Sequence, residues 1–317
     1  MDFSSKSRKA RFWFATGLTQ LIAGPLTLWG IYGIGTYGIA LFVLTPFLIG
    51  LCSTVLYGYG RKIHGWEAAR VGFTALAVFT VLLLLFAIEG AVCIAMVAPI
   101  AVIGAYFGTI AGKLIVNRMP DRTLLSIALV AASITLLGLV EAGTSATVQP
   151  VVTRIIINAP PQAVWKRVVA FPELDPPREM LFRAGISYPI RATITGKGIG
   201  AIRYCTFNTG SFVEPITVWD EPRLLAFTVE EQPEPLREIS PWDVAAPHLH
   251  DYFVSQRGQF RLTELPDGRT ELEGTTWYYH DIHPDFYWRL WSDYIIHRIH
   301  DRVLGHIKTV VEREVTR

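Results

Sequence analysis

The stretch "VVTRIIINAPPQAVWKRVVAF", residues 151–171, predicts a β-strand followed directly by a short helix. Its first seven residues are rich in β-branched side chains, which favour an extended chain. Asn158 is then a candidate helix cap, and two prolines precede apolar residues at helical spacing. A strand and a helix therefore open the second half of this 317-residue chain.

The remainder of this half predicts a series of strands that ends in one long helix. Turn signals such as "GKGIG", "DEP" and "PDG" separate the strands, and the final helix starts at Pro284. One strand, a helix, six strands in hairpins and a terminal helix form an α+β pattern. The six strand-like runs are residues 186–195, 200–208, 211–219, 223–230, 256–264 and 269–280.

The order of these elements resembles the helix-grip fold of the SRPBCC, or START-like, superfamily, which includes polyketide cyclases and lipid-transfer domains. The resemblance covers residues 151–313 and is carried by "INAPPQAVWKRVVAFPELDP" (157–176), by "LPDGRTELEGTTWY" (265–278) and by the long final helix. It implies a curved antiparallel sheet wrapped around that helix, with an apolar cavity between them. Because the superfamily has no shared catalytic set, the resemblance implies no particular catalytic residue. A proline-rich insert, residues 230–253, departs from the pattern and could cover the mouth of the cavity.

The first half of the chain has the composition of a membrane region. Residues 1–149 contain 10 Lys/Arg and 5 Asp/Glu, whereas residues 150–317 contain 19 and 22 and read as ordinary globular sequence. A helix needs about 20 apolar residues to cross a bilayer. We therefore predict an α-helical transmembrane domain at residues 1–140, a linker at 141–150 and the helix-grip domain at 151–317. The five predicted spans are residues 12–30, 39–59, 71–88, 91–115 and 123–140.

Two of the breaks between these spans have recognisable sequence signals: the break between the first and second spans and the break between the third and fourth. The stretch "GIYGIGTYG", residues 30–38, has too many glycines for an uninterrupted helix, and Glu89-Gly90 predicts a tight turn. Glu89 either lies at a plain turn near water or faces the second domain or a polar cavity. A carboxylate at bilayer depth is costly and usually functional.

The distribution of Lys and Arg predicts the orientation of the chain in the membrane. The N-terminal tail and the second and fourth loops carry basic residues, whereas the first and third loops carry none. By the positive-inside rule the N-terminus lies in the cytoplasm, and five crossings place the C-terminal domain outside it. We therefore predict an integral plasma (inner) membrane protein. If the Glu89 hairpin or the fifth span does not cross, the C-terminal domain is cytoplasmic.

Several classes of function are disfavoured by the residues. The second half has no basic stripe, which makes nucleic acid a poor candidate partner. "GKGIG" joins two strands and precedes no helix, so it is no dinucleotide-binding fingerprint, and we predict no cofactor. Cys205 is the single thiol of the second half, which excludes an internal disulfide there.

Strand alternation predicts the side chains that face the cavity. Glu271 and Glu273 mark the solvent face of the last strand, so Tyr278 and His280 should point inward. The candidate ligand-binding residues are Phe212, Phe227, Phe260, Tyr278, His280 and His300.

Glu214 shares the apolar phase of its strand, and two alternatives stay open for it. It either points inward among aromatic side chains, as a functional carboxylate with a raised pKa, or is turned outward by a bulge at Pro215.

Five of the eight histidines lie within residues 280–308. Asp293, His297 and His300 share a stripe of the final helix at one-turn spacing, apart from its isoleucine-rich face. The stripe is a structural wall, a proton-handling or polar ligand site, or a metal site; its spacing matches no specific metal motif, and we assign no metal. A metal would need a further ligand from His248, His250, His280 or His283. We expect His297 and His300 to contact polar groups of another segment: the strand ends, the insert 230–253 or the membrane half. We expect His306, on the apolar face, to be a buried histidine with one satisfied nitrogen.

These features predict a membrane-tethered protein that binds, and transfers or presents, a hydrophobic or amphipathic, lipid-like small molecule. The alternative is an enzyme acting on such a ligand by acid–base chemistry, with Glu214, His280, Asp293 and His297 as catalytic candidates. A second alternative is an assembly or sensing protein without a ligand, which an interior filled by large side chains would favour. Expected partners are the lipid bilayer and the ligand, and a homo-oligomeric or membrane-protein partner stays open.

Overall fold

The computed structural model describes residues 7–242, 244, 246–250 and 252–316, which form two compact units. The first unit comprises the chain up to Ser145 together with Glu238–Pro247 and Ile282–Pro284. The second unit contains Ala146–Arg237, His248–Asp281 and Asp285–Arg317. Two short segments of the second half of the sequence therefore pack with the helical first half.

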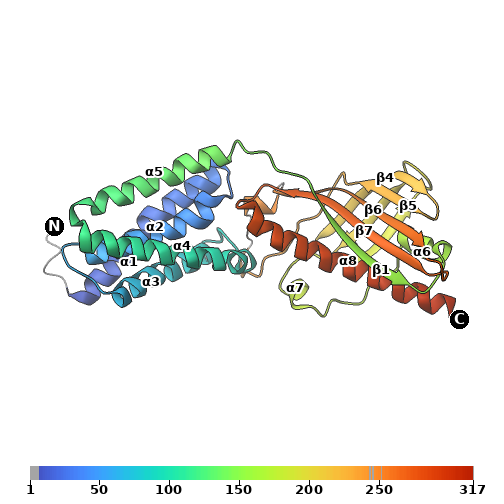
Figure 1. Ribbon diagram of the computed structural model, residues 1–317, viewed down its shortest axis with the longest axis horizontal. Coiled ribbons are helices and arrows are strands. Elements are labelled where there is room, and N and C mark those ends of the chain that lie inside the picture. Colours follow the sequence, from blue (N-terminus) through green and yellow to red (C-terminus); the bar gives the residue numbers. More distant parts are fainter. Residues whose placement is uncertain (1–6, 243, 245, 251, 317) are drawn as a thin grey trace. The chain divides into compact units, whose positions relative to one another are not determined.

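The first unit is a bundle of helices (Figure 1). The glycine-rich break predicted before the second span is present, and Gly35 adopts a left-handed conformation there, with a φ of 75°. The helices are α1 (Arg8–Leu28), η1 (Trp29–Ile34), η2 (Ala40–Leu44), α2 (Thr45–Gly58), α3 (Gly65–Leu85), α4 (Ala91–Arg118), η3 (Pro120–Arg122) and α5 (Thr123–Glu141).

Among the described residues, four helical segments are long and apolar enough to cross a membrane: Ala40–Gly58, Gly65–Leu85, Ala91–Arg118 and Pro120–Glu141. They coincide with the last four predicted spans. Most of the stretch predicted as the first span, 12–30, lies in α1, which is not one of the four, because basic and polar residues such as Arg11 and Gln20 lower the hydropathy of that helix. Membrane crossing by α1 stays a prediction.

Glycines on α4 allow a close approach of its backbone to that of η2 and α2. Gly104, Gly108 and Gly112 recur at every fourth residue, and they face the carbonyl oxygens of Val43, Phe47 and Leu51, which have the same spacing. A Cβ added at Gly104 or Gly112 would lie 2.8 or 2.9 Å from its carbonyl oxygen, and one at Gly108 would come closer still. Small residues at every fourth position are the usual means by which membrane helices pack backbone to backbone.

Carboxylates cap helix starts within this unit. Glu141 accepts hydrogen bonds from the backbone N–H groups of Ile39 (2.7 Å) and Ala40 (3.3 Å). Glu238, from the insert, does the same for Val92 (2.9 Å) and Cys93 (3.0 Å) at the start of α4. A negative charge is favourable at this end of a helix.

Glu89 forms part of the turn between α3 and α4, as predicted. Burial, and then the nearby Glu238 carboxylate, raise the pKa of Glu89 to about 8. The Glu89 side chain is half-buried, and the two roles predicted for it stay predictions.

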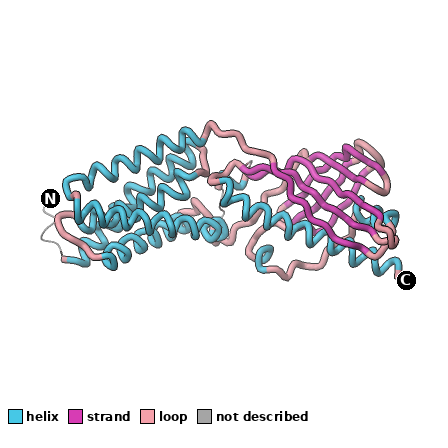
Figure 2. The backbone as a smooth tube through the Cα atoms, in the orientation of Figure 1, coloured by secondary structure: helices cyan, strands magenta, loops and turns pink. Residues whose placement is uncertain are grey.

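The second unit is a seven-stranded antiparallel sheet with a long C-terminal helix (Figures 1 and 2). The strand order β1-β7-β6-β5-β4-β3-β2 places the first strand beside the last, and the others follow as hairpins. Each of the predicted strand-like runs forms a strand. Their bounds are β1 (Gln149–Ile157), β2 (Pro189–Thr195), β3 (Ile202–Phe207), β4 (Gly210–Asp220), β5 (Leu224–Thr228), β6 (Phe253–Glu264) and β7 (Thr270–His280).

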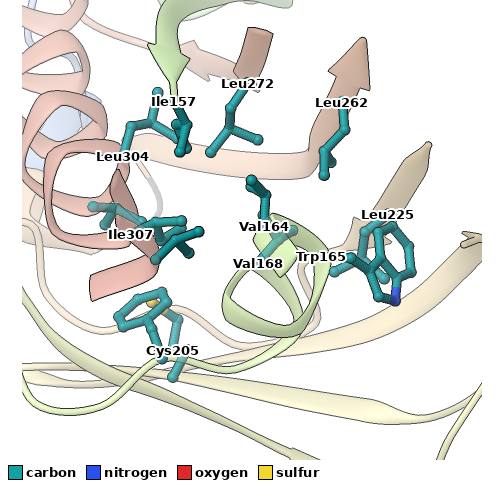
Figure 3. Close-up of a cluster of buried hydrophobic side chains, with 14 of the residues drawn as sticks. Ile157, Val164, Trp165, Val168, Cys205, Leu225, Leu262, Leu272, Leu304 and Ile307 are labelled. Atoms are coloured by element: carbon teal, nitrogen blue, oxygen red, sulfur yellow. The ribbon is translucent and has the colours of Figure 1, made fainter. Parts of the chain in front are cut away.

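The helices of this unit are α6 (Pro161–Val169), the short α7 (Met180–Arg183), η4 (Pro247–Leu249, at the boundary of the units) and α8 (Asp285–Val315). Side chains of α6 and α8 meet those of the sheet in one apolar core, which Figure 3 shows around Val164, Leu304 and Ile307. Leu225, Leu272, Leu304 and Ile307 have no accessible surface. An antiparallel sheet gripping a C-terminal helix is the arrangement that the sequence predicted.

The helical spacing predicts one covered face of α8, and the face that the sheet covers differs from it in part. The predicted face comprises Trp288, Ile295, Ile296, Ile299, Val303, Ile307 and Val310. Trp288, Ile296, Val303 and Ile307 are buried as expected, and Leu304 and Val311 join them. Ile295, Ile299 and Val310 are only partly buried. The buried face is therefore rotated slightly, which brings the neighbouring polar stripe of α8 into contact with the sheet.

Candidate functional site

The concave face of the sheet carries two phenylalanines in its middle. Phe227 on β5 and Phe260 on β6 have ring centroids 6.2 Å apart, and both belong to the apolar core or pack against it. Phe227 lies opposite Gly258, whose missing side chain leaves the space that the ring occupies. Phe212, the third phenylalanine predicted for this face, packs against Phe207 with a centroid distance of 4.9 Å.

Beside these rings lies an ion pair within the protein interior. Arg203 on β3 and Glu214 on β4 are directly opposite in the sheet register, and Nη1 of Arg203 donates to Oε2 of Glu214. The two residues are only 1% and 5% exposed. The register is regular at Pro215, and the irregularity of β4 lies further on, between Ile216 and Val218. Glu214 therefore points inward, and the outward alternative is wrong.

Aromatic rings surround the guanidinium of Arg203. Its Cζ lies 5.6 Å from the ring centroid of Phe171, and 5.5 Å from those of Phe227 and Phe260. Its Nε donates to the carbonyl oxygen of Val169 at 3.3 Å. The ion pair is thus held in an apolar, aromatic environment in which its electrostatic interaction is strong.

Burial has a clear effect on the ionisable groups of this site. It raises the pKa of the Glu214 carboxyl, and the guanidinium of Arg203 opposes that shift. Burial also raises the pKa of the Cys205 thiol, two residues along β3, to about 12. Cys205 is therefore an uncharged thiol that lines the site, and it is not a thiolate nucleophile.

Sequence analysis did not identify Arg203 as a site residue. Arg203 nevertheless shares its inward phase on β3 with Cys205 and Phe207. The inward phase of Arg203 on β3 and that of Glu214 on β4 were the sequence signal from which the ion pair could have been predicted. Opposite charges on neighbouring inward positions predict a buried pair.

A second polar cluster lies at the β1–β7 side of the concave face. The hydroxyl of Thr153 is hydrogen-bonded to Nδ1 of His297 (2.8 Å) and to Nδ1 of His300 (3.0 Å). Nε2 of His300 in turn pairs with the hydroxyl of Thr276 at 2.8 Å. The predicted contact of His297 and His300 with another segment is confirmed. The partners lie in the middle of β1 and β7, whereas we expected strand ends, the insert or the membrane half.

The other predicted polar residues have separate partners. Tyr278 is fully buried and donates its hydroxyl to Asp293 at 2.6 Å, so Asp293 does not orient His297. His280 is buried as predicted, and its Nε2 lies 3.6 Å from Oδ1 of Asp285. The three residues of the stripe therefore have different partners. Asp293 bonds to Tyr278 on β7, and His297 bonds to Thr153 on β1. His300 bonds to residues of both strands.

The remaining histidines also have local roles. His283 pairs through Nε2 with the hydroxyl of Thr144 at 3.0 Å, within the first unit. His306 makes a hydrogen bond with the backbone of Pro172, and burial lowers its pKa. Among the described residues its Nε2 is buried without a hydrogen-bond partner. The single satisfied nitrogen is as predicted, but the His306 side chain as a whole is only partly buried, whereas a buried histidine was expected.

The two polar clusters are joined by the row of residues that crosses the sheet. Thr276 is opposite Gly258, and Gly258 is opposite Phe227. Since neighbouring strands are about 4.8 Å apart, Thr276 and Phe227 are separated by about 10 Å across the sheet. The concave face thus has a histidine–threonine cluster on one side, phenylalanines in the middle and the Arg203–Glu214 pair on the other side.

Acidification should destabilise the protein through His300. Burial, and then the neighbouring His297, lower the pKa of His300 from 6.5 to about 4. Between these pH values the unfolded chain takes up a proton that folded His300 does not. Stability is therefore complete above pH 6.5 and falls as the pH decreases toward 4, by up to about 3 kcal/mol for this group.

Denaturant unfolding of the full chain in detergent at several pH values measures this effect. In His300→Gln the pH dependence over that window should decrease by about one proton. An unchanged slope in His300→Gln would contradict the assignment.

Comparison with known proteins gives matches to structures only. No family model matches the chain, and no curated protein matches it. Norcoclaurine synthase from Thalictrum flavum is 12% identical and aligns with 53% of this chain and 96% of its own, with a TM-score of 0.34. The Zhui aromatase/cyclase from a Streptomyces species is 16% identical over 53% of this chain and 96% of its own, with a TM-score of 0.33. A protein from Nitrosospira multiformis is 16% identical over 53% of this chain and 100% of its own, with a TM-score of 0.35.

These matches concern the C-terminal half, and no activity follows from them. The strand order and α8 define the class of this half directly: it is an antiparallel helix-grip α+β domain.

Proposed function

We propose that the chain is a membrane-anchored protein that binds an amphipathic, lipid-like small molecule on the concave face of its helix-grip domain. The apolar part of the ligand contacts Phe227 and Phe260, and its polar group meets the Arg203–Glu214 pair. Phe260 faces inward but keeps some accessible surface, unlike Leu225 and Leu272 beside it. The ligand therefore belongs at the phenylalanines and not at the close-packed leucines.

The observation that carries this proposal is the enclosed ion pair. Burying two charges costs several kcal/mol of desolvation, and apolar residues of similar size often stabilise a fold as well or better. An Arg–Glu pair inside an apolar core is therefore better explained by ligand recognition than by stability. A guanidinium has five N–H donors, more than Glu214, Val169 and Cys205 need. The surplus suits an acceptor group such as a carboxylate, carbonyl or hydroxyl of the ligand.

Anchoring in the bilayer gives this binding site a supply of apolar ligands. A molecule dissolved in lipid can reach a tethered domain without passing through bulk water, where its apolar surface would be costly to expose. The four apolar helices support membrane insertion. Basic side chains of two different helices also lie at one end of the bundle. Nη2 of Arg11 on α1 donates to the carbonyl oxygen of Tyr59 (2.6 Å), and the guanidinium of Arg70 on α3 lies 5.8 Å from the ring of Phe12. This end fits the cytoplasmic side.

If α1 also crosses, the C-terminal domain lies outside the cytoplasm. An alkaline phosphatase fused after Arg317 should then be active, whereas a phosphatase inserted beside Arg122 should be inactive. Green fluorescent protein at the same two places should give the opposite pattern. Phosphatase activity beside Arg122, or fluorescence after Arg317, would contradict the proposed topology.

One observation favours an enzyme as the second candidate. Thr153 is hydrogen-bonded to both His297 and His300, and His300 continues to Thr276, so the four side chains form a chain through which a proton can move. Such a chain beside an apolar binding face suits acid–base chemistry on a bound ligand. His297→Gln should then abolish turnover while ligand binding persists.

The proposed binding function is tested by recovering the ligand. Full-length protein is purified into nanodiscs of defined lipid, and its bound molecules are extracted with organic solvent and identified by mass spectrometry. We expect a compound with an apolar body and one polar group, at close to one per chain. Protein that carries only the nanodisc lipids, in the proportions of empty discs, would refute the binding proposal.

A further inference from the structure

An apolar groove of about 580 Å³ runs along the outer face of α3, within the first unit. Its lining residues follow one face of the helix at spacings of three and four, and they include Trp66, Arg70, Phe73, Ala77, Val81 and Leu82. From Trp66 to Leu82 the groove covers 16 residue steps, or about 24 Å of helix. This length exceeds the depth of one leaflet of a hydrocarbon core that is about 30 Å thick.

The only charged side chain that lines this groove lies near its start. Arg70 is exposed, and its guanidinium lies 5.8 Å from the ring of Phe12 and 6.0 Å from that of Trp66. Arg61 on the preceding loop is neutralised by Glu67 at 3.4 Å, but within the described part of the chain no carboxylate pairs with Arg70. The groove is open and is lined by α3 alone, and it combines a long apolar face of that helix with one positive charge near its start.

We propose that this groove holds one anionic phospholipid, with an acyl chain along Phe73–Leu82 and the phosphate at Arg70. The charge of Arg70 is complementary to an anionic headgroup. Trp66 is 73% exposed beside it, and tryptophan prefers the headgroup level of a membrane. A basic residue at the surface contributes attraction to anionic lipid, whereas the apolar lining fits any acyl chain. Selectivity for negative lipid therefore depends on Arg70.

This inference depends on the membrane insertion that the proposed function includes, but not on ligand binding by the helix-grip domain. Retention of the chain in membranes washed at alkaline pH tests insertion separately. Loss of the chain in that wash would refute insertion, and unselective lipid binding by an inserted chain would refute only the groove.

The start of α5 provides a matched control. Arg122 is exposed and precedes a helix with exposed leucines, such as Leu125 and Leu129, but none of these residues lines the groove. Native mass spectrometry of protein from nanodiscs with equal phosphatidylglycerol and phosphatidylcholine counts the lipids that stay bound. We expect wild type to prefer phosphatidylglycerol, Arg70→Gln to lose about fivefold of this preference, and Arg122→Gln to keep it.

A photoreactive phosphatidylglycerol with a diazirine in its acyl chain locates the lipid. Adducts should concentrate on the α3 peptide and be lost in Ala77→Trp, which fills the groove at an exposed position without changing its charge. Ala132→Trp on the exposed face of α5 should not reduce them. Equal lipid preference in wild type and Arg70→Gln, or adducts spread evenly over α3 and α5, would overturn the proposal.

Discussion

Arg203→Met is expected to destabilise the helix-grip domain by about 3–5 kcal/mol, because it leaves Glu214 buried without its counter-charge. Glu214→Met should have an effect of similar size for the same reason. Denaturant unfolding of the full chain in detergent, followed by the circular dichroism of the sheet, measures both. The aromatic rings around Arg203 keep water away from the charge that remains in either single variant. Solvation is therefore expected to offset little of the loss in stability.

The double variant Arg203→Met/Glu214→Met should behave differently from either single variant. With both charges replaced by apolar side chains, its stability should return to within about 1 kcal/mol of wild type or exceed it. The ion pair Arg154–Glu273 is the control: its Arg154 side chain is 59% exposed to solvent, and Arg154→Met should cost less than about 1 kcal/mol. Additive losses in the double variant would mean that the pair itself stabilises the fold.

Gly108→Ala should disrupt the contact between α2 and α4. The new methyl group would meet the carbonyl oxygen of Phe47, a backbone atom that no rotamer change can move away. We expect a loss of about 1–3 kcal/mol or more, since overpacking forces whole segments to shift. Thermal unfolding in detergent, with size-exclusion chromatography to detect aggregation, measures this loss.

Gly17→Ala is the matched control for this substitution. Gly17 also lies within a helix, but an added Cβ would meet nothing within 4 Å. This variant should be as stable as wild type or slightly more stable. Equal behaviour of Gly108→Ala and Gly17→Ala would show that α2 and α4 do not need the close approach.

The fold was largely predictable from the sequence because its signals are local. The β-branched run at 151–157 and the prolines before α6 determine their elements through short-range preferences, and the hairpin turns separate the strands. The signal for the start of α8, Pro284, is equally local in the sequence. The rotation of its buried face is not, because it depends on how Leu304 and Val311 fit against the sheet and α6.

The candidate site was less predictable, since it depends on pairs that are distant in the sequence or hidden by alternation. The inward phase of Glu214 was one of two open alternatives, but its partner Arg203 was missed. Both His297 and His300 bond to Thr153 on β1, which is more than 100 residues away in the sequence. His300 also bonds to Thr276 on β7. Only the register of β1 with β7 brings these groups together.

The role of the Arg203–Glu214 pair in ligand binding is the central claim, and the double methionine variant tests it most directly. Wild type, Arg203→Met/Glu214→Met and Arg154→Met are purified in identical nanodiscs, shown to be folded, and extracted for mass spectrometry. The account predicts that wild type and Arg154→Met retain the same amphipathic compound near one per chain, and that the folded double variant loses at least nine-tenths of it, about 1.4 kcal/mol or more in affinity. Equal retention of that compound by the folded double variant would contradict the account.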